Sequence, residues 1–386
     1  MKGSADRIIT THVGSLPRPA DLLDMMKARL SGAKYDAGTY DARVKQAVAD
    51  CVRQQVACGL DVVADGEMSK PGFFVYVKER LTGFEPRPGK GPALFAAERA
   101  AFPEYYEDYF RRAMLGAGVA PMAPMFCIGP IRYVGADALR KDLDNLKAAL
   151  AAVDHTEAFV PAVAPSGVGF NDYYKSDEEY LFAVAEALAV EYRAIVNAGF
   201  LLQVDDPFLS DVFVEPGLDE KAKASKAQTY VDALNHALRG IAPERVRFHT
   251  CYGINEGPRI HEAALAEVVG YMLRVNAGAY SFEAANCRHE HEYHLWETVN
   301  LPDGKIVIPG VITHASNIVE HPELIAERIT RFAHLVGREN VVPAADCGFS
   351  SQATYKTEVH PTVIWEKFKA LAEGARIATR RLWPQT

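Results

Sequence analysis

A histidine and a cysteine with the spacing of a metal-binding pair occur in the segment His249-Thr250-Cys251. The apolar run around them predicts a β-strand over residues 245–253, and alternate residues of a strand project to the same side. His249 and Cys251 would therefore face one point, and imidazole nitrogen and thiolate sulfur are both zinc ligands. A buried cysteine packed beside a core histidine is the alternative interpretation of the pair.

Two further residues supply the rest of a four-ligand set. Cys347 ends the last predicted strand, and the glycine after it permits a tight turn. Glu283 lies at the end of a predicted strand between the other two in the chain. One nitrogen, two sulfurs and one carboxylate oxygen suit zinc, whereas calcium and magnesium prefer oxygen ligands. The sequence therefore predicts a Zn²⁺ site formed by His249, Cys251, Glu283 and Cys347.

More polar residues lie at or near the ends of predicted strands, namely Ser15, Glu67, Asp205, Asp206 and His314. In an α/β barrel these ends converge on one mouth, where barrel enzymes hold their active sites. Two carboxylates beside a serine and backbone amides suit the charged groups of an amino acid. A metal ion would convert a bound thiol into a nucleophilic thiolate, and His314 would protonate the leaving group. A solvated helix-cap histidine is the alternative for His314.

The elements that position these residues follow from the alternation of short apolar runs and amphipathic stretches, which predicts parallel strands joined by helices. Candidate strands cover residues 7–15, 60–67, 126–133, 159–166, 200–207, 245–253, 279–286, 305–314 and 341–348. Helical patterns include residues 41–57, 176–198, 219–239, 258–275 and 322–336. We expect an α/β fold, a single (β/α)8 TIM barrel, with 126–133 as an additional strand outside the closed sheet.

We expect one catalytic barrel domain over residues 1–386, without internal repeats or linkers. Residues 83–124 form an insertion with an aromatic, acidic helix, and insertions of this length usually cover an active-site mouth or an interface.

The net charge of −8, without a long basic run, argues against nucleic acid and anionic membranes as partners. No apolar stretch approaches about 20 residues, and the N-terminus lacks an apolar signal core, so we expect a cytoplasmic protein. The six scattered cysteines are expected as thiols or metal ligands.

The ordered motifs resemble those of cobalamin-independent methionine synthase over nearly the whole chain. HTCYG, the strand-terminal glutamate and ADCGF are similar to that family's zinc-ligand motifs, which implies the ligands His249, Cys251, Glu283 and Cys347. THVGSLPRP, DGE and QVDDP resemble its homocysteine-binding segments, which implies substrate-binding roles for Val13, Gly14, Ser15, Glu67 and Asp205. GVITHAS resembles the segment that carries the catalytic histidine, here His314.

The resemblance implies a barrel like those of methionine synthase and uroporphyrinogen decarboxylase. It also implies zinc-dependent methylation of homocysteine, or of a similar amino-acid thiol, from 5-methyltetrahydrofolate or another methyl donor. This chain corresponds only to the C-terminal barrel of the two-barrel enzyme, and the family's folate-stacking tryptophan has no clear match. The donor, a partner protein that supplies it, and assembly into a homo-oligomer therefore stay open.

Other functions and another metal site are also open. A zinc thiolate would serve an alkyl transferase or lyase that acts on another thiol and electrophile, such as coenzyme M and an epoxide. A barrel with a structural zinc ion would instead be a non-catalytic binding protein. In NCRHEHEYHLWE, a second metal site, a lining of the mouth or a solvated cluster would all account for Cys287, His289, His291 and His294.

Overall fold

The computed structural model describes residues 1–91, 94–114, 117–120, 123–253 and 256–383. Within these residues, seven parallel strands form a sheet in the order β1-β4-β6-β7-β8-β9-β10. The strands are β1 (Val62–Ala64), β4 (Glu157–Val163), β6 (Leu201–Asp205), β7 (Val246–His249), β8 (Ala279–Phe282), β9 (Ile306–Ile312) and β10 (Ala344–Ala345). All of their residues except Glu157 are buried, as expected for a parallel sheet covered on both faces.

The N-terminal segment lies between the first and last strands of this sheet and closes the barrel. The carbonyl oxygen of Thr10 accepts hydrogen bonds from the N–H groups of Asp61 (3.1 Å) and Val62 (3.0 Å). On the other side, the N–H of Thr11 donates to the carbonyl oxygen of Pro343 (3.1 Å). Residues 7–15 therefore occupy the predicted place of a barrel strand, although they lack a regular strand ladder. The predicted α/β barrel is confirmed.

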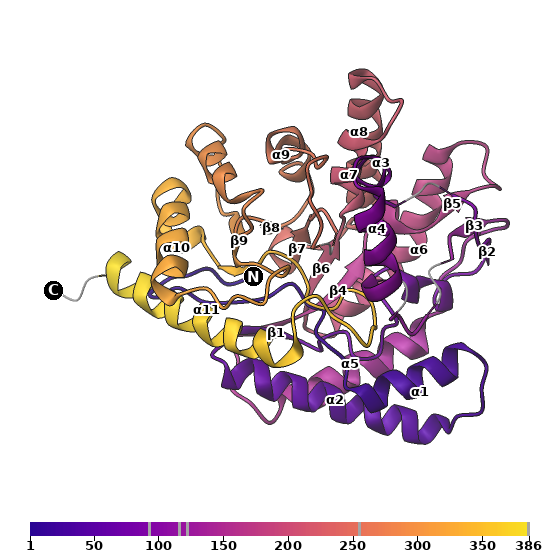
Figure 1. Ribbon diagram of the computed structural model, residues 1–386, viewed down its shortest axis with the longest axis horizontal. Coiled ribbons are helices and arrows are strands. Elements are labelled where there is room, and N and C mark those ends of the chain that lie inside the picture. Colours follow the sequence, from indigo (N-terminus) through magenta and orange to yellow (C-terminus); the bar gives the residue numbers. More distant parts are fainter. Residues whose placement is uncertain (92–93, 115–116, 121–122, 254–255, 384–386) are drawn as a thin grey trace.

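Helices cover the outside of the barrel (Figure 1). They are α1 (Ala20–Leu30), α2 (Ala37–Ala57), α5 (Ala136–Leu150), α6 (Asp177–Asn197), α7 (Phe208–Val214), α8 (Glu220–Ala237), α9 (Leu265–Met272), α10 (Pro322–Val336) and α11 (Pro361–Leu382). Helices α2, α6 and α8 begin after Asp36, Ser176 and Asp219, whose side chains accept a hydrogen bond from the backbone N–H three residues later. Such caps satisfy donors that the first helical turn leaves free. Short turns are η1 (Val75–Glu79), η3 (Pro165–Gly167), η4 (Pro243–Arg245), η5 (Glu290–Glu297) and η6 (Arg338–Asn340).

The helical predictions agree well with these bounds, with one exception. The predicted helix at 322–336 coincides with α10, and those at 41–57, 176–198 and 219–239 correspond to α2, α6 and α8. The helix predicted at 258–275 is wrong over its first part, because α9 begins only at Leu265. Residues before α9 include Arg259, whose positive φ of 58° is incompatible with a right-handed helix.

The insertion at 83–124 and the segment after it build a second, smaller sheet at the edge of the molecule (Figure 1). Strand β3 (Met125–Cys127) pairs antiparallel with β2 (Phe84–Pro86) and parallel with β5 (Phe170–Asn171). The predicted additional strand at 126–133 therefore does lie outside the barrel sheet, although it is shorter. The insertion also carries α3 (Ala96–Ala101), α4 (Pro103–Tyr109) and the π-helical turn η2 (Phe110–Met114).

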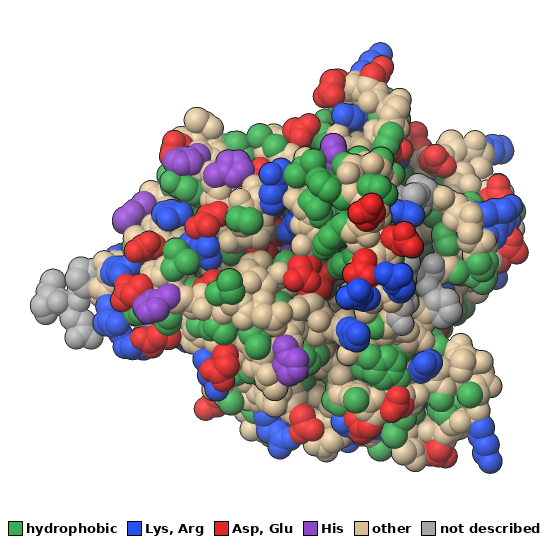
Figure 2. All heavy atoms as spheres, in the orientation of Figure 1, with side chains coloured by type: hydrophobic (Ala, Val, Ile, Leu, Met, Phe, Trp, Pro, Cys, Tyr) green, Lys and Arg blue, Asp and Glu red, His purple; other side chains and the backbone are tan. Residues whose placement is uncertain are grey.

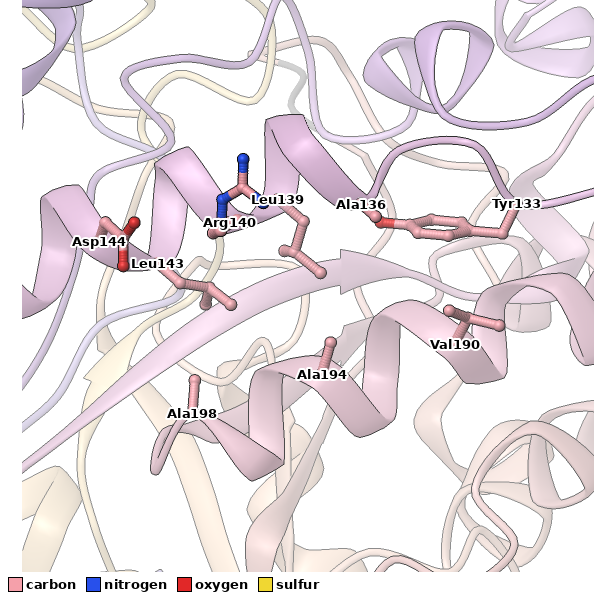
Figure 3. A pocket seen from close by; sticks show the side chains of 9 residues that line it. All are labelled: Tyr133, Ala136, Leu139, Arg140, Leu143, Asp144, Val190, Ala194 and Ala198. Atoms are coloured by element: carbon pink, nitrogen blue, oxygen red, sulfur yellow. The ribbon is translucent and has the colours of Figure 1, made fainter.

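Acidic and basic side chains are interspersed over the face in Figure 2. Among the described residues, no helix has the length and apolar character needed to cross a membrane. A hollow of ≈ 300 Å³ lies between α5 and α6, where apolar side chains of the two helices face each other (Figure 3). It contains none of the predicted site residues; its lining is Tyr133, Ala136, Leu139, Arg140, Leu143, Asp144, Val190, Ala194 and Ala198.

Candidate functional site

Three of the four predicted metal ligands meet at the carboxyl ends of the barrel strands. His249 is the last residue of β7, Cys251 follows two residues later, and Cys347 lies two residues beyond β10. Their ligand atoms all lie within 4.8 Å of one another, and all three side chains are buried. The ends of β7 and β10, which are separated in the sheet by β8 and β9, thus bring one nitrogen and two sulfurs from distant parts of the chain to one point.

The histidine of this group is oriented for coordination. Its Nδ1 lies 3.1 Å from Oγ of Ser281 on the adjacent strand β8. Its Nε2 is buried and has no hydrogen-bond partner among the described residues. Burial, with a smaller contribution from Arg247, lowers the pKa of His249 to about 3, which keeps the ring neutral. A neutral imidazole fixed through one nitrogen, with the other nitrogen free, is what a metal ligand requires.

The two cysteines also fit a cation. Proximity of Cys251, followed by burial, raises the pKa of the Cys347 thiol well above its ordinary value. A positive ion between the sulfurs would reverse this effect, because metal coordination deprotonates thiols. The free Nε2 and the paired sulfurs therefore form a candidate metal-binding site, and their chemistry suits a soft or borderline ion.

Glu283, the fourth predicted ligand, lies in a neighbouring group with His314 and Asp346, within 4.8 Å of each. Both of its oxygens have partners. Oε2 accepts hydrogen bonds from Arg259 Nη2 (2.7 Å) and Asn286 Nδ2 (2.7 Å), and Oε1 accepts one from the N–H of Tyr252 (3.2 Å). The structure therefore places Glu283 beside the three-ligand group and directs its carboxylate to Arg259.

Asp346, the third member of this group, has a structural role. Its Oδ1 accepts from the N–H groups of Ala284 and Ala285 (2.7 Å each). Its Oδ2 accepts from the N–H (2.9 Å) and Nδ2 (3.1 Å) of Asn286. A carboxylate offers about four lone-pair sites, so Asp346 has no position left for a metal ion. It instead ties the segment after β8 to the residue that precedes Cys347.

His314 lies just beyond β9 and is fully buried. Neither ring nitrogen reaches hydrogen-bond geometry with another described residue, although the backbone of Gly253 lies close enough to favour the protonated ring. Burial, and then the charge of Arg259, lowers the pKa of His314 to about 4. The predicted catalytic histidine is thus a buried, neutral ring with unsatisfied nitrogens just beyond β9, which contradicts a solvated cap.

The predicted amino-acid subsite is formed by buried carboxylates. Glu67 and Asp205 are both buried; Glu67 Oε2 has no hydrogen-bond partner among the described residues, and Arg18 Nη2 lies 3.8 Å from it. Burial, followed by the charge of Glu67, raises the pKa of Asp205 well above its ordinary value. Two carboxyl groups that disfavour each other's charge would be stabilised by a cationic group between them.

Gln203 connects this subsite to the segment that closes the barrel. Its Nε2 donates to Asp205 Oδ1 (2.7 Å) and to the carbonyl oxygen of Val13 (2.5 Å). A Cβ atom on Gly14 would lie 2.7 Å from Pro161 Cγ, so only glycine fits beside β4 at that position. Asp206 has a different use, since its Oδ1 accepts from Ser166 Oγ (2.7 Å) and from the N–H of Leu209 (3.0 Å) at the start of α7.

Ser15 joins the two halves of the site. Its carbonyl oxygen accepts a hydrogen bond from the N–H of Phe349 (3.0 Å). Its Oγ packs against the backbone of Gly348, where a Cβ atom would lie only 2.0 Å away. Gly348 follows Cys347 directly. The predicted substrate segment 13–15 is therefore in contact with the loop that carries the candidate ligand Cys347.

The insertion packs against the segment that follows Cys251. A Cβ atom on Gly253 would lie 3.4 Å from the ring of Phe95, and Glu98 Oε1 accepts from the N–H of His261 (2.8 Å). Figure 1 shows α3 and α4 drawn in front of α7 and α6. Of the two expected roles, cover of the mouth or of an interface, these contacts favour cover of the mouth, because Gly253 lies two residues after Cys251.

The rival histidine cluster does not assemble into a metal site in the described part of the chain. His289 bridges two carboxylates, Glu262 (2.9 Å) and Glu292 (2.7 Å), and His294 lies 2.7 Å from Glu297. Cys287 is exposed, and the possible metal-binding groups among described residues include none of these side chains. The hydrogen-bonded cluster is the interpretation that the structure supports.

Comparison with known proteins identifies the family. The family model described as "Cobalamin-independent synthase, Catalytic domain" matches residues 8–114 and 164–363. These segments include more than half of the chain and every predicted site residue. The chain belongs to this family. As a cobalamin-independent synthase it is an enzyme, and its reaction is methyl transfer.

Sequence alignments with known relatives extend over nearly the whole length of this cobalamin-independent synthase. It is 23% identical to a methionine synthase of Thermococcus kodakarensis over 97% of this chain and 94% of the relative. It is also 23% identical to a methionine synthase of Sulfurisphaera tokodaii over 97% and 93%, respectively. Its fold resembles that of a B12-independent methionine synthase from Shewanella sp. W3-18-1, solved with selenomethionine, with a TM-score of 0.73 and 21% identity. That match covers 98% of this chain and 100% of the other.

Sequence reasoning missed several residues that build the site of this synthase. Ser281 and Gln203 lie on predicted strands two residues before predicted site residues, so the alternation of side chains could have indicated them. Asp346 precedes the predicted ligand Cys347 in the sequence. Its four hydrogen bonds form only where the end of β10 approaches the segment after β8, which the sequence does not reveal. Nothing in the sequence indicates a site role for Arg259, because the apolar spacing of residues 258–275 favours a helix.

Proposed function

We propose that this enzyme methylates the thiol of homocysteine, with His249, Cys251 and Cys347 holding a Zn²⁺ ion and Glu283 as its exchangeable fourth ligand. The observation that carries the proposal is the group of three buried ligand atoms within 4.8 Å of one another, one of which belongs to His249, the register partner of Asp205 on the adjacent strand. When bound, zinc supplies a positive charge that lowers the pKa of a coordinated thiol and makes it nucleophilic at neutral pH.

The polar residues around this group account for the amino-acid part of the substrate. Glu67 and Asp205 bind the ammonium group, because a cation between two buried carboxyl groups is stabilised by both. Val13, Gly14 and Ser15 bind the remaining backbone atoms of the amino acid and orient its side chain toward Cys347. Ser15 packs directly on Gly348, which follows Cys347 in the chain. An amino acid bound at Ser15 would therefore lie beside the loop that carries this ligand.

His314 serves the methyl donor. As the thiol sulfur bonds to the methyl carbon, the bond from that carbon to the donor breaks, and the leaving atom gains a proton. His314 is neutral in the free enzyme, so it must take up a proton when the donor binds; the nearby carboxylates of Asp346 and Glu262 favour this. The methionine synthases among the relatives favour methyl transfer over the alternative of an epoxide and coenzyme M.

The test combines metal content with activity. The purified protein is expected to hold about one zinc ion per chain, and to form methionine from homocysteine with a folate methyl donor or another donor. Cys347→Ser should lose both properties. Cys58→Ser is the matched control, because Cys58 is also a buried free cysteine but lies at the C-terminus of α2. It should keep its zinc and its activity.

Unaltered methyl transfer by zinc-free Cys347→Ser protein would refute the proposal. Bound zinc with activity only toward another thiol or electrophile would refute the choice of substrate while leaving the metal site intact.

A further inference from the structure

Arg259 is a buried cation that bridges two carboxylates at the edge of the proposed metal site. Its Nη2 donates to Glu283 Oε2 (2.7 Å), and its Nε donates to Glu262 Oε1 (2.6 Å). The side chains of Arg259 and Glu283 are 4% and 0% exposed, so solvent screens this ion pair very little. Glu283 is thus held by a strong, charge-assisted contact outside the group formed by His249, Cys251 and Cys347.

The position of Arg259 is enforced by its surroundings. Its φ of 58° lies in the left-handed region, which costs an arginine roughly 1–3 kcal/mol and persists only where neighbours hold it. The neighbours form a chain: Glu262 accepts from Arg259 and contacts His289 (2.9 Å), and the ring of His289 stacks on Tyr252 with centroids 4.0 Å apart. The arginine is therefore a fixed receptor for a carboxylate.

The backbone near Glu283 is equally fixed, so only its side chain is free to change partners. Asp346 binds the N–H groups of Ala284, Ala285 and Asn286. This ties the end of β8 to the residue before Cys347 and keeps Glu283 next to the metal ligands. An exchange of Arg259 for the metal ion would then be a movement of the Glu283 side chain alone.

We propose that Arg259 is a positioning residue, which receives the carboxylate of Glu283 when it leaves the metal and thereby keeps the fourth coordination position open for the substrate sulfur. The inference rests on the proposed function. Two thiolates neutralise a divalent ion, so an incoming substrate thiolate makes the centre negative. A displaced glutamate that stayed buried without a countercharge would add a large desolvation cost. Arg259 supplies that countercharge at 2.7 Å.

The inference predicts that Arg259 affects thiol binding only through Glu283. In Arg259→Met, Glu283 keeps its neutral donors Asn286 and Tyr252 but loses its countercharge and competes with the thiol, so the Kd for homocysteine should rise at least tenfold. In a Glu283→Gln background, the same arginine substitution should change the Kd less than twofold. Cobalt(II) in place of zinc gives a second readout, because its absorption spectrum reports each added sulfur ligand. The sulfur-to-cobalt charge-transfer bands should then appear in Arg259→Met only at homocysteine concentrations at least tenfold higher than in wild type.

Arg328→Met is the matched control. Arg328 is also a buried arginine and pairs with Glu290 (2.9 Å), which is not in the site. Its loss should leave the thiol Kd and the cobalt spectrum unchanged. If Arg259→Met does not fold, Arg259→Lys is compared in the wild-type and Glu283→Gln backgrounds, because lysine keeps the charge but cannot make both directed contacts.

Equal thiol affinity in Arg259→Met and wild type, or an equally large effect of the arginine substitution in both backgrounds, would overturn the inference. A wild-type protein that binds cobalt and homocysteine in such a case would show that the proposed function stands and only the role of Arg259 fails. A wild-type protein that binds neither would instead contradict the proposed function.

Discussion

Individual side chains in this site gain their properties from one or two specific neighbours. His249 is available as a ligand because Ser281 occupies one ring nitrogen and burial keeps the ring neutral. Asp205 is held by Gln203, and its carboxyl group lies under the influence of Glu67. The exposed His294, by contrast, pairs with Glu297 at the surface and lacks this burial.

At this scale we predict that Asp205→Asn weakens the binding of the amino-acid thiol without loss of the metal. Removing one partner of a charged hydrogen bond costs about 1.5–3 kcal/mol, so KM for homocysteine should rise roughly 10–150-fold. The measurement is KM for homocysteine and for a thiol that lacks the amino group. Wild type should discriminate strongly between the two, and the variant weakly. Unchanged discrimination would mean that Asp205 does not contact the ammonium group.

The strands position the site residues through the points at which they end. Strands β7, β8 and β9 stop at or within two residues of His249, Glu283 and His314, so the parallel sheet delivers their side chains to one edge. The segment that replaces an eighth regular strand brings Ser15 against Gly348. Close packing of two loop backbones, one from each end of the chain, therefore forms part of the site.

Gly348→Ala should disrupt this contact, because the new Cβ atom would lie 2.0 Å from Ser15 Oγ. Overpacking of this kind costs about 1–3 kcal/mol and should displace the substrate segment, raising KM for the thiol about tenfold or more. Gly270→Ala is the control, since nothing lies within 4 Å of its Cβ position on α9. It should leave KM unchanged and increase the free energy of unfolding by about 0.5–1 kcal/mol. Similar KM values for both variants would contradict the proposed contact.

Over the whole molecule, ion pairs connect the segment before α9 with η5. His289 lies between Glu262 and Glu292 and has a side chain only 5% exposed. Burial opposes its charge, but the hydrogen bonds to the two carboxylates outweigh burial and raise the pKa of His289 to about 9. The ring is therefore protonated at neutral pH in the folded protein, whereas the unfolded chain would release this proton near pH 6.5.

This difference predicts a pH-dependent stability. Below about pH 6.5 both states bind the proton and the full contribution is present, and it is lost as the pH rises through about 9. A pKa that rises from 6.5 to about 9 corresponds to a contribution of roughly 3 kcal/mol. Urea unfolding of wild type and His289→Gln, with the metal removed, should show that the difference in free energy of unfolding shrinks between pH 6 and pH 9.5. Parallel profiles for the two proteins would refute the prediction.

Much of this arrangement could be predicted from residue types and order. The alternation of apolar runs and amphipathic helices gave the barrel, because each pattern reports which side of a local element is buried. The spacing in His249-x-Cys251 fixed a shared direction for two ligands, and the position of Cys347 at a strand end added the third. The extra strand outside the barrel was predicted from the excess of apolar runs.

Other features were decided only by tertiary structure. Local patterns do not report which strand ends touch, so neither the partners of Asp346 nor the contact between Ser15 and Gly348 could be deduced. The apolar spacing of residues 258–275 favours a helix, yet the buried pair of Arg259 with Glu283 holds the chain at a positive φ. The residue types and their order along the chain determined the barrel and the metal chemistry of this protein. The partner of Glu283 was decided only in the folded molecule, because a buried charge takes whichever opposite charge the packing brings within reach.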